Sequence, residues 1–250
     1  MFCVCYRLLT TGYGLGSSLS FPVMSNGIRR LYLDNAATSF PKPATVHQAM
    51  ARYATELGAS AGRGAYHEAV ETGQLIAQCR QRLNRLFNGQ NPNHFVFTLN
   101  CSDALNLGIK GLTACSGQSA VGSAKQHVIC THIDHNSILR PLGAMEDRGE
   151  CEVTRVAINP STGLVDPDDV KKAIRPETRL IAITHASNVT GTIQAVREIG
   201  RIAREHDIPF LVDAAQSAGH IPVDVQADHI DLLAAPGHKA LLGPLGTGFL

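Results

Sequence analysis

The chain has 250 residues, of which 44% are apolar and 17% are charged. This balance is typical of a globular protein with a sizeable core, and it excludes a largely disordered chain. The formal net charge of +1 provides no electrostatic footprint for nucleic acid or a membrane surface. No stretch approaches about 18 uninterrupted apolar residues, so no transmembrane helix is predicted. We therefore expect neither nucleic acid nor membrane as a partner.

The cysteines are odd in number and scattered along the chain. There are seven of them: Cys3, Cys5, Cys79, Cys101, Cys115, Cys130 and Cys151. No C-x-x-C pair occurs, so we expect no zinc site and no other bound metal. Unpaired thiols in a chain of this kind fit a reducing compartment, and we expect a cytoplasmic protein.

Residues 1–29 differ in composition from the rest. They hold closely spaced glycines and short polar side chains, without the apolar core or the A-x-A site of a secretory signal. We predict a disordered leader or N-terminal arm, or an upstream start with Met24 as the true first residue. Residues 30–250 show no internal repeat and are expected to form one domain.

Short apolar runs alternate with helical patterns from residue 31 onward. In chain order, a helix is predicted at 66–87, strands at 94–98, 126–131 and 152–157, a helix at 166–174, a strand at 179–184, a helix at 196–206, and strands at 208–213, 230–235 and 246–250. Continuous apolar strands are typical of sheets covered on both faces. We predict an α/β fold of three layers, with a mostly parallel mixed sheet of about seven strands covered by helices.

One apolar stripe is predicted along the helix at 66–87. It consists of Val70, Leu75, Cys79, Leu83 and Leu86. The helix at 166–174 opens with an N-cap acid, Asp166, and an N1 proline, Pro167.

Polar side chains follow five of the predicted strands, at the edge where open α/β sheets bind ligands. Asn100 or Ser102 can cap a helix whose first amides form an anion site. His135 lies in the turn after residue 131, and Asn188 follows the strand that ends at residue 184. Each of these signals alone also fits a plain helix cap or a polar surface side chain.

The last two strand ends carry an acid and a lysine. Asp213, with Gln216 close behind, ends an apolar strand, where a carboxylate is costly unless a cation meets it. His238 and Lys239 follow Gly237, which permits a tight turn or a close approach to a ligand. Pyridoxal phosphate (PLP) would use all five strand ends. Among its requirements are a helix N-terminus for its phosphate, a carboxylate for its pyridine nitrogen and a lysine for its aldehyde.

Four segments resemble the class V aminotransferases, in the order in which that family carries them. They are residues 32–38 (YLDNAAT), 184–191 (THASNVTG), 211–216 (LVDAAQ) and 237–239 (GHK). Within the family the chain is most similar to the cysteine desulfurase and selenocysteine lyase group, over about residues 30–250. The resemblance implies PLP as cofactor, the major domain of a PLP-dependent transferase, and a homodimer that shares the pocket between its subunits.

The resemblance also implies a role for each matching residue. Lys239 would hold PLP as a Schiff base and act as the catalytic base. Asp213 would pair with the pyridine nitrogen, and Gln216 would hydrogen-bond to the ring hydroxyl oxygen. His135 would stack on the ring and assist proton transfer, and Asn188 would lie near the ring hydroxyl and the substrate.

Further residues are expected at the two ends of the pocket. The phosphate end would take Cys101 and Ser102 through their amides, Ser102 also through its hydroxyl, and His238. The substrate entrance would lie near Ala36, Ala37 and Arg63. Many relatives have Ser where Pro236 stands, so one phosphate contact is expected to be lost.

The activity implied is removal of sulfur from L-cysteine, giving alanine and an enzyme persulfide for a sulfur-acceptor protein, as in sulfur metabolism and iron–sulfur cluster assembly. Family members continue into a small C-terminal domain that supplies the nucleophilic Cys and a carboxylate-binding Arg, and neither is assigned in this chain. Cys101 is not expected to substitute, because its expected place is on the phosphate side.

Three alternatives stay open. The chain could belong to another class V enzyme, such as an aminotransferase, selenocysteine lyase, β-lyase or epimerase, because binding the cofactor does not choose the reaction. It could also be an inactive PLP-binding fragment. A dinucleotide-binding domain would need G-x-G-x-x-G after a strand, and Gly12-Tyr-Gly14-Leu-Gly16 lies within 1–29 instead.

Overall fold

The structure is a computed structural model that describes residues 31–115 and 125–250. The leader or arm expected at 1–29, with its glycine-rich run, lies outside the described residues. Residues 34–250 form one compact unit. No helix in the described ranges combines the length and the apolar character needed to cross a bilayer.

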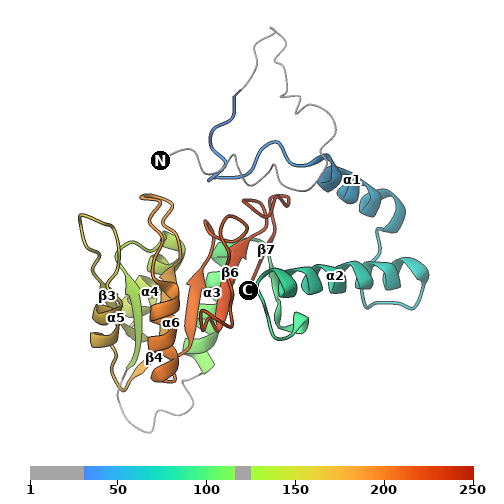
Figure 1. Ribbon diagram of the computed structural model, residues 1–250. Helices are drawn as coiled ribbons and strands as arrows, with labels where there is room; N and C mark the ends of the chain where they lie inside the picture. The colour runs from blue at the N-terminus through green and yellow to red at the C-terminus, as the bar shows by residue number, and fades with distance from the viewer. Residues whose placement is uncertain (1–30, 116–124) are drawn as a thin grey trace. The chain divides into compact units, whose positions relative to one another are not determined.

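The elements alternate between helix and strand along most of the chain (Figure 1). In order they are α1 (Ala44–Arg52), the π-helical turn η1 (Tyr53–Leu57), α2 (His67–Leu86), the 3₁₀ turn η2 (Pro92–His94), β1 (Phe97–Thr98), α3 (Cys101–Cys115), β2 (Gln126–Thr131), α4 (Asn136–Asp147), β3 (Cys151–Val156), α5 (Pro167–Lys172), β4 (Thr178–Thr184), α6 (Val196–Glu205), β5 (Phe210–Asp213), β6 (Leu232–Pro236) and β7 (Gly248–Phe249).

The strands form one seven-stranded sheet in the order β1-β7-β6-β5-β4-β2-β3. The pairs β3–β2, β2–β4, β4–β5 and β5–β6 are parallel, whereas β7 pairs antiparallel with both β6 and β1. The predicted mostly parallel mixed sheet of seven strands is therefore confirmed. All parallel strands end at the same edge, so the loops that follow β2, β4, β5 and β6 meet there.

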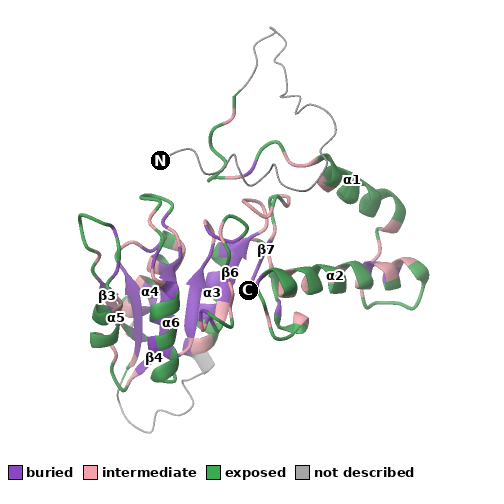
Figure 2. Ribbon diagram, in the orientation of Figure 1, coloured by how far each residue is buried: buried purple, intermediate pink, exposed green. Residues whose placement is uncertain are grey.

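Both faces of the sheet are covered, because successive strand side chains point to opposite sides. On one face, Val128 and Leu180 pack with residues of α3 and α4 such as Leu105 and Leu142. On the other face, Ile181 packs with residues of α5 and α6, among a second cluster of buried side chains. Figure 2 shows the central strands as buried between mostly exposed helix surfaces. The three-layer arrangement is thus confirmed.

The first predicted strand is shorter than expected. The Asn91 side chain accepts a hydrogen bond from the Asn93 amide at 2.9 Å, and the chain turns through η2 before β1 begins at Phe97. Val96 and Leu250 still exchange two backbone hydrogen bonds. The run of apolar residues from 94 to 98 therefore contributes one short edge strand.

The apolar stripe of α2 is not covered in the way that its pattern predicts. The helix itself forms, but Ala69 and Thr72 are its only buried residues. Val70, Leu75 and Leu86 are 47%, 38% and 52% exposed, respectively. The helix forms where the stripe predicts it, and of the stripe residues Leu83 packs against the core cluster, whereas these three leave much of the stripe exposed in the described chain.

Gly200 lets α6 approach the backbone of the loop before β6. A Cβ at this position would lie 2.0 Å from the Asp228 carbonyl oxygen, so one of the two segments would have to shift. We expect Gly200→Ala to lower the free energy of unfolding by about 1–3 kcal/mol, the usual cost of overpacking. Urea unfolding measures this.

The matched control is Gly111→Ala in α3, where an added Cβ would meet nothing within 4 Å. This change should raise stability by roughly 0.5–1 kcal/mol, because alanine favours the helix. Equal effects of the two substitutions would contradict the close approach of α6.

Candidate cofactor pocket

A cavity of about 150 Å³ opens at the carboxyl edge of the sheet. All eight residues predicted to bind the cofactor line it: Cys101, Ser102, His135, Asn188, Asp213, Gln216, His238 and Lys239. The remaining lining residues are Asn100, Leu105, Ser137, Thr184, Ala186, Ala215 and Pro236. Residues spread over 140 positions of sequence thus converge because four parallel strands end together.

Two helix N-termini meet at this cavity. Asn100 caps α3, its side-chain oxygen accepting from the Asp103 amide at 2.8 Å, which was one of the two predicted caps. His135 caps α4, where its Nδ1 accepts from the Ser137 amide at 3.1 Å. The hydroxyls of Ser102 and Ser137 lie 2.6 Å apart and join the two ends. Paired helix N-termini with adjacent hydroxyls favour an anionic group such as a phosphate.

Asp213 is the buried acid of the cavity, with 2% of its surface exposed. One of its oxygens, Oδ1, accepts from the Ala215 amide at 2.9 Å and from the Cys101 thiol at 3.5 Å. Burial raises the pKa of Asp213, while these hydrogen bonds and the positive charge of Lys239 lower it. A cationic group beside this carboxylate would offset the cost of burial.

The Cys101 thiol points toward Asp213. Burial raises the pKa of the Cys101 thiol well above its ordinary value, and the Asp213 charge and hydrogen bond raise it further. Cys101 is therefore held as a neutral hydrogen-bond donor. Its side chain thus faces the acid, while its amide belongs to the first turn of α3.

The segment that carries Lys239 is firmly anchored. The His238 carbonyl accepts from the Ser39 amide and hydroxyl, both at 3.1 Å, and from Lys42 Nζ at 2.5 Å. The Gly237 amide donates to the Thr247 carbonyl at 2.8 Å, and the Gly237 carbonyl accepts from the Gly243 amide at 2.7 Å. A Cβ on Gly237 would lie 2.3 Å from the Thr247 hydroxyl, so glycine serves a close approach here. Burial and the two neighbouring lysines lower the pKa of His238.

The predicted substrate-entrance residues are only partly brought together. Gln216 Nε2 donates to the Ala36 carbonyl at 3.3 Å, which places Ala36 at the rim. Ala37 is exposed and does not line the cavity. Arg63 is exposed in the turn between η1 and α2 and does not line the cavity either. The substrate roles of Ala37, Arg63 and Asn188 stay predictions.

Sequence reasoning missed three residues at this edge. Ser137 and Thr184 line the cavity, and the buried Asp134 lies just behind His135. Each stands within two residues of a predicted strand end or of His135, which was the available signal. Their roles depend on contacts with other elements, and the pattern along one strand does not show those.

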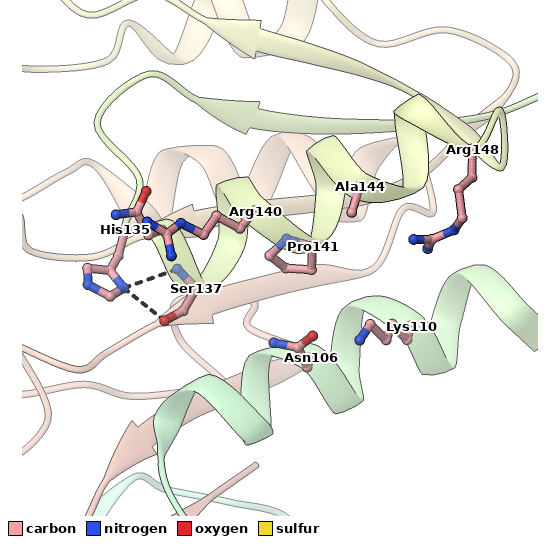
Figure 3. Close-up of a pocket in the computed structure, with 9 residues that line it drawn as sticks. Asn106, Lys110, His135, Ser137, Arg140, Pro141, Ala144 and Arg148 are labelled. Carbon is pink, nitrogen blue, oxygen red and sulfur yellow. Dashed lines mark hydrogen bonds between the residues drawn. The ribbon is translucent and has the colours of Figure 1, made fainter.

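A larger hollow of about 560 Å³ adjoins the pocket between α3 and α4. Both hollows are lined by His135 and Ser137, and the larger one also carries Lys110, Arg140 and Arg148. Figure 3 shows Lys110 on α3, Arg140 on α4 and Arg148 at the C-terminal end of α4. Arg148 pairs with Glu150, at 3.0 Å for the longer of its two bonds. Lys110 and Arg140 therefore add positive charge to the hollow that adjoins the pocket, and positive charge attracts anionic ligands.

The residues present fit PLP. The cavity brings together a serine-lined pair of helix N-termini, a buried carboxylate at the end of β5 and the amine of Lys239, with Leu105 and Ala215 as apolar walls. These are the three polar groups that the phosphate, the ring nitrogen and the aldehyde carbon of this cofactor require.

Comparison with known proteins gives a consistent result. The family described as aminotransferase class-V matches residues 31–250. A probable cysteine desulfurase of Methanothermobacter thermautotrophicus is 40% identical over 220 residues, covering 88% of this chain and 52% of the relative. The cysteine desulfurase IscS of Dictyoglomus turgidum is 36% identical, covering 89% and 54%. The chain spans about half the length of these curated relatives.

Solved structures share the fold. SspA in complex with cysteine superposes with a TM-score of 0.79 at 36% identity, covering 87% of this chain and 60% of that one. The apo cysteine desulfurase of Thermococcus onnurineus NA1 gives a TM-score of 0.77 at 32% identity, covering 86% and 52%. The family match spans every residue that builds the pocket, and on that basis the chain belongs to the class V aminotransferases, a family of PLP enzymes.

Proposed function

We propose that the protein carrying this chain is a PLP-dependent cysteine desulfurase, which releases sulfur from L-cysteine and leaves alanine and an enzyme persulfide. The observation that carries the proposal is the convergence of Lys239, Asp213 and the two helix N-termini on one cavity. The relatives named as cysteine desulfurases and the neighbour solved with cysteine support this substrate.

Each wall of the pocket has its proposed task. Ser102, the first amides of α3 and the nearby His238 hold the phosphate. Asp213 faces the ring nitrogen and keeps negative charge there, supported by its amide bond from Ala215. Gln216 and Asn188 hydrogen-bond around the ring hydroxyl, and His135 lies against the ring. Lys239 holds the cofactor through its amine.

The reaction needs proton transfer at the substrate α-carbon. When bound, PLP supplies an electron sink for the pair left by the departing α-proton. Lys239 takes that proton once its amine has been released, because it lies in the same cavity as the cofactor-binding residues. His135 is the second group able to carry a proton, with its Nδ1 fixed by the Ser137 amide. The anchored 237–239 segment holds the base in place.

The sulfur-accepting thiol is proposed to come from sequence outside these 250 residues, together with the arginine that grips the substrate carboxylate. Among the described free cysteines, burial raises the pKa of Cys79, Cys101 and Cys151, and it raises that of Cys130 to about 12. None is thus prepared as a thiolate nucleophile in the described part of the chain.

We propose a homodimer as the working form. The exposed apolar stripe of α2 supports it, since Val70, Leu75 and Leu86 together offer a surface that a second copy can cover. Arg63, in the turn before α2, is then proposed to serve the pocket of the other copy. A reducing compartment such as the cytoplasm suits the free thiols, and some curated relatives are named as mitochondrial. A sulfur-acceptor protein would complete the transfer.

Lys239→Ala should abolish the visible absorbance of bound PLP and the adduct that borohydride fixes to the chain, because no other amine is proposed to hold the cofactor. Absorbance spectra and peptide mass mapping after reduction measure both. Lys172→Ala, a lysine paired with Asp169 in α5, should keep both signals. An equal reducible adduct in Lys239→Ala would refute the assignment.

Asp213→Ala in the full-length protein should weaken PLP binding by at least about tenfold, or about 1.4 kcal/mol, because the ring nitrogen loses its charged partner. Formation of alanine from L-cysteine should slow by more, since proton removal depends on that nitrogen staying charged. Titration with PLP and amino-acid analysis measure the two effects. A keto acid as the product would instead identify an aminotransferase, and unchanged α-proton exchange would count against Asp213.

A further inference from the structure

The sheet has a gap at the carboxyl ends of β2 and β4. These strands pair in register only from His127 to Ile129 on β2 and from Thr178 to Ile181 on β4. Amides along a strand alternate between its two neighbours. His127 donates to the Glu177 carbonyl beside β4, so the Thr131 amide, four residues on, faces β4 as well. The pairing of β2 with β4 has ended by this point, so no strand carbonyl of the described residues accepts from the Thr131 amide.

The same alternation places an amide of β4 in the gap. Ile181 donates to the Pro209 carbonyl beside β5, so Thr184, three residues on, donates toward β2. Two buried amides, one from each strand, therefore point into a space that the ladder does not reach. Leaving them without acceptors would cost about 1–3 kcal/mol each.

One carboxylate satisfies both amides. Asp134 Oδ2 accepts from the Thr131 amide and Oδ1 from the Thr184 amide, each at 2.6 Å. The Asp134 side chain is enclosed, with 6% of the residue exposed. Short bonds from amides to an ionised oxygen are among the stronger hydrogen bonds in proteins. The carboxylate thus replaces the missing rungs of the ladder.

The Asp134 carboxylate and its two amide donors lie next to the cofactor pocket. His135, the next residue, caps α4 and lines the cavity, and Thr184 lines it too and leads through Ala186 to Asn188. We propose that Asp134 is a positioning residue, whose carboxylate sets the spacing between the His135 wall and the Asn188 wall of the cofactor pocket. This inference rests on the proposed PLP function for its binding consequence.

The electrostatics show that burying the Asp134 carboxylate is costly and that its two amide donors offset part of this cost. Burial raises the pKa of Asp134 to about 7, with a further contribution from the Asp213 charge, while the two amide bonds lower it. Both oxygens accept from N–H groups, an arrangement that suits the ionised form. Asp134 does not line the cavity itself, so it acts through the residues that do.

The test replaces Asp134 in the full-length protein. Asp134→Asn keeps the shape but puts an NH₂ group against one of the two amides. We expect a PLP dissociation constant at least about tenfold higher and a weaker circular dichroism band of the bound cofactor. Without cofactor, amide hydrogen exchange in the peptides that contain His135 and Asn188 should be about tenfold faster.

The matched control is Asp228→Asn. Asp228 is similarly buried, at 7% exposed, and accepts from Arg197 Nε at 2.8 Å and from the Asp224 amide at 3.3 Å, away from the cavity. Its loss should lower stability while leaving cofactor affinity and exchange in the two peptides within about twofold of wild type. If Asp134→Asn does not fold, Asp134→Glu keeps the charge and both oxygens, and it should bind PLP more weakly because its carboxylate is displaced by one methylene.

The outcomes separate the two proposals. The positioning role would be overturned if PLP affinity and amide hydrogen exchange in the Asp134 variants were the same as in Asp228→Asn. Failure of the wild-type protein to form any Lys239-dependent adduct would overturn the proposed function instead. The exchange comparison without cofactor would still decide whether Asp134 holds the two walls together.

Discussion

The parallel pairing of β2, β4, β5 and β6 is the constraint on which the rest of the structure depends. Hydrogen bonding in register forces these strands to end at one edge, and each crossover, through a helix or, between β5 and β6, through a loop, delivers the next loop to the same place. His135, Asn188, Asp213 and Lys239 are widely spaced in the sequence, yet they line one cavity for this reason. The pocket is thus a consequence of topology before it is a consequence of side-chain chemistry.

Two buried acids at this edge are satisfied in different ways. Asp134 has both oxygens filled by backbone amides of the neighbouring strands. Asp213 accepts one amide and one weak thiol bond on a single oxygen, and the nearby Lys239 ammonium offsets part of the cost of its burial. A carboxylate left this way at the wall of a cavity suits a cationic ligand atom. The contrast supports the two proposed roles, in which Asp134 holds the scaffold and Asp213 faces the cofactor.

The sequence was most informative where a local pattern and a topological rule agree. Apolar runs located β2 and β4 to within a residue, and the rule that ligands bind at the carboxyl ends brought out the polar residues after them. The family motifs then separated these residues from ordinary caps and surface charges. Asp134 and Ser137 were missed, because the amide of Thr184 and the hydroxyl of Ser102 reach them from other elements. Such contacts depend on register, which one strand's pattern does not contain.

The apolar stripe on α2 also shows what a sequence pattern cannot contain, in this case the partner of a predicted face. Periodicity identifies an apolar face, but the partner of that face lies outside the pattern, and within the described chain α2 buries only Ala69 and Thr72. Helices in proteins owe most of their stability to packing of such a face. A 20-residue helix that leaves Val70 and Leu86 half exposed thus supports the proposed homodimer, in which a second copy would cover this face. Because Arg63 lies in the turn shortly before this helix and does not line its own pocket, covering α2 with a second copy would account for both features at once.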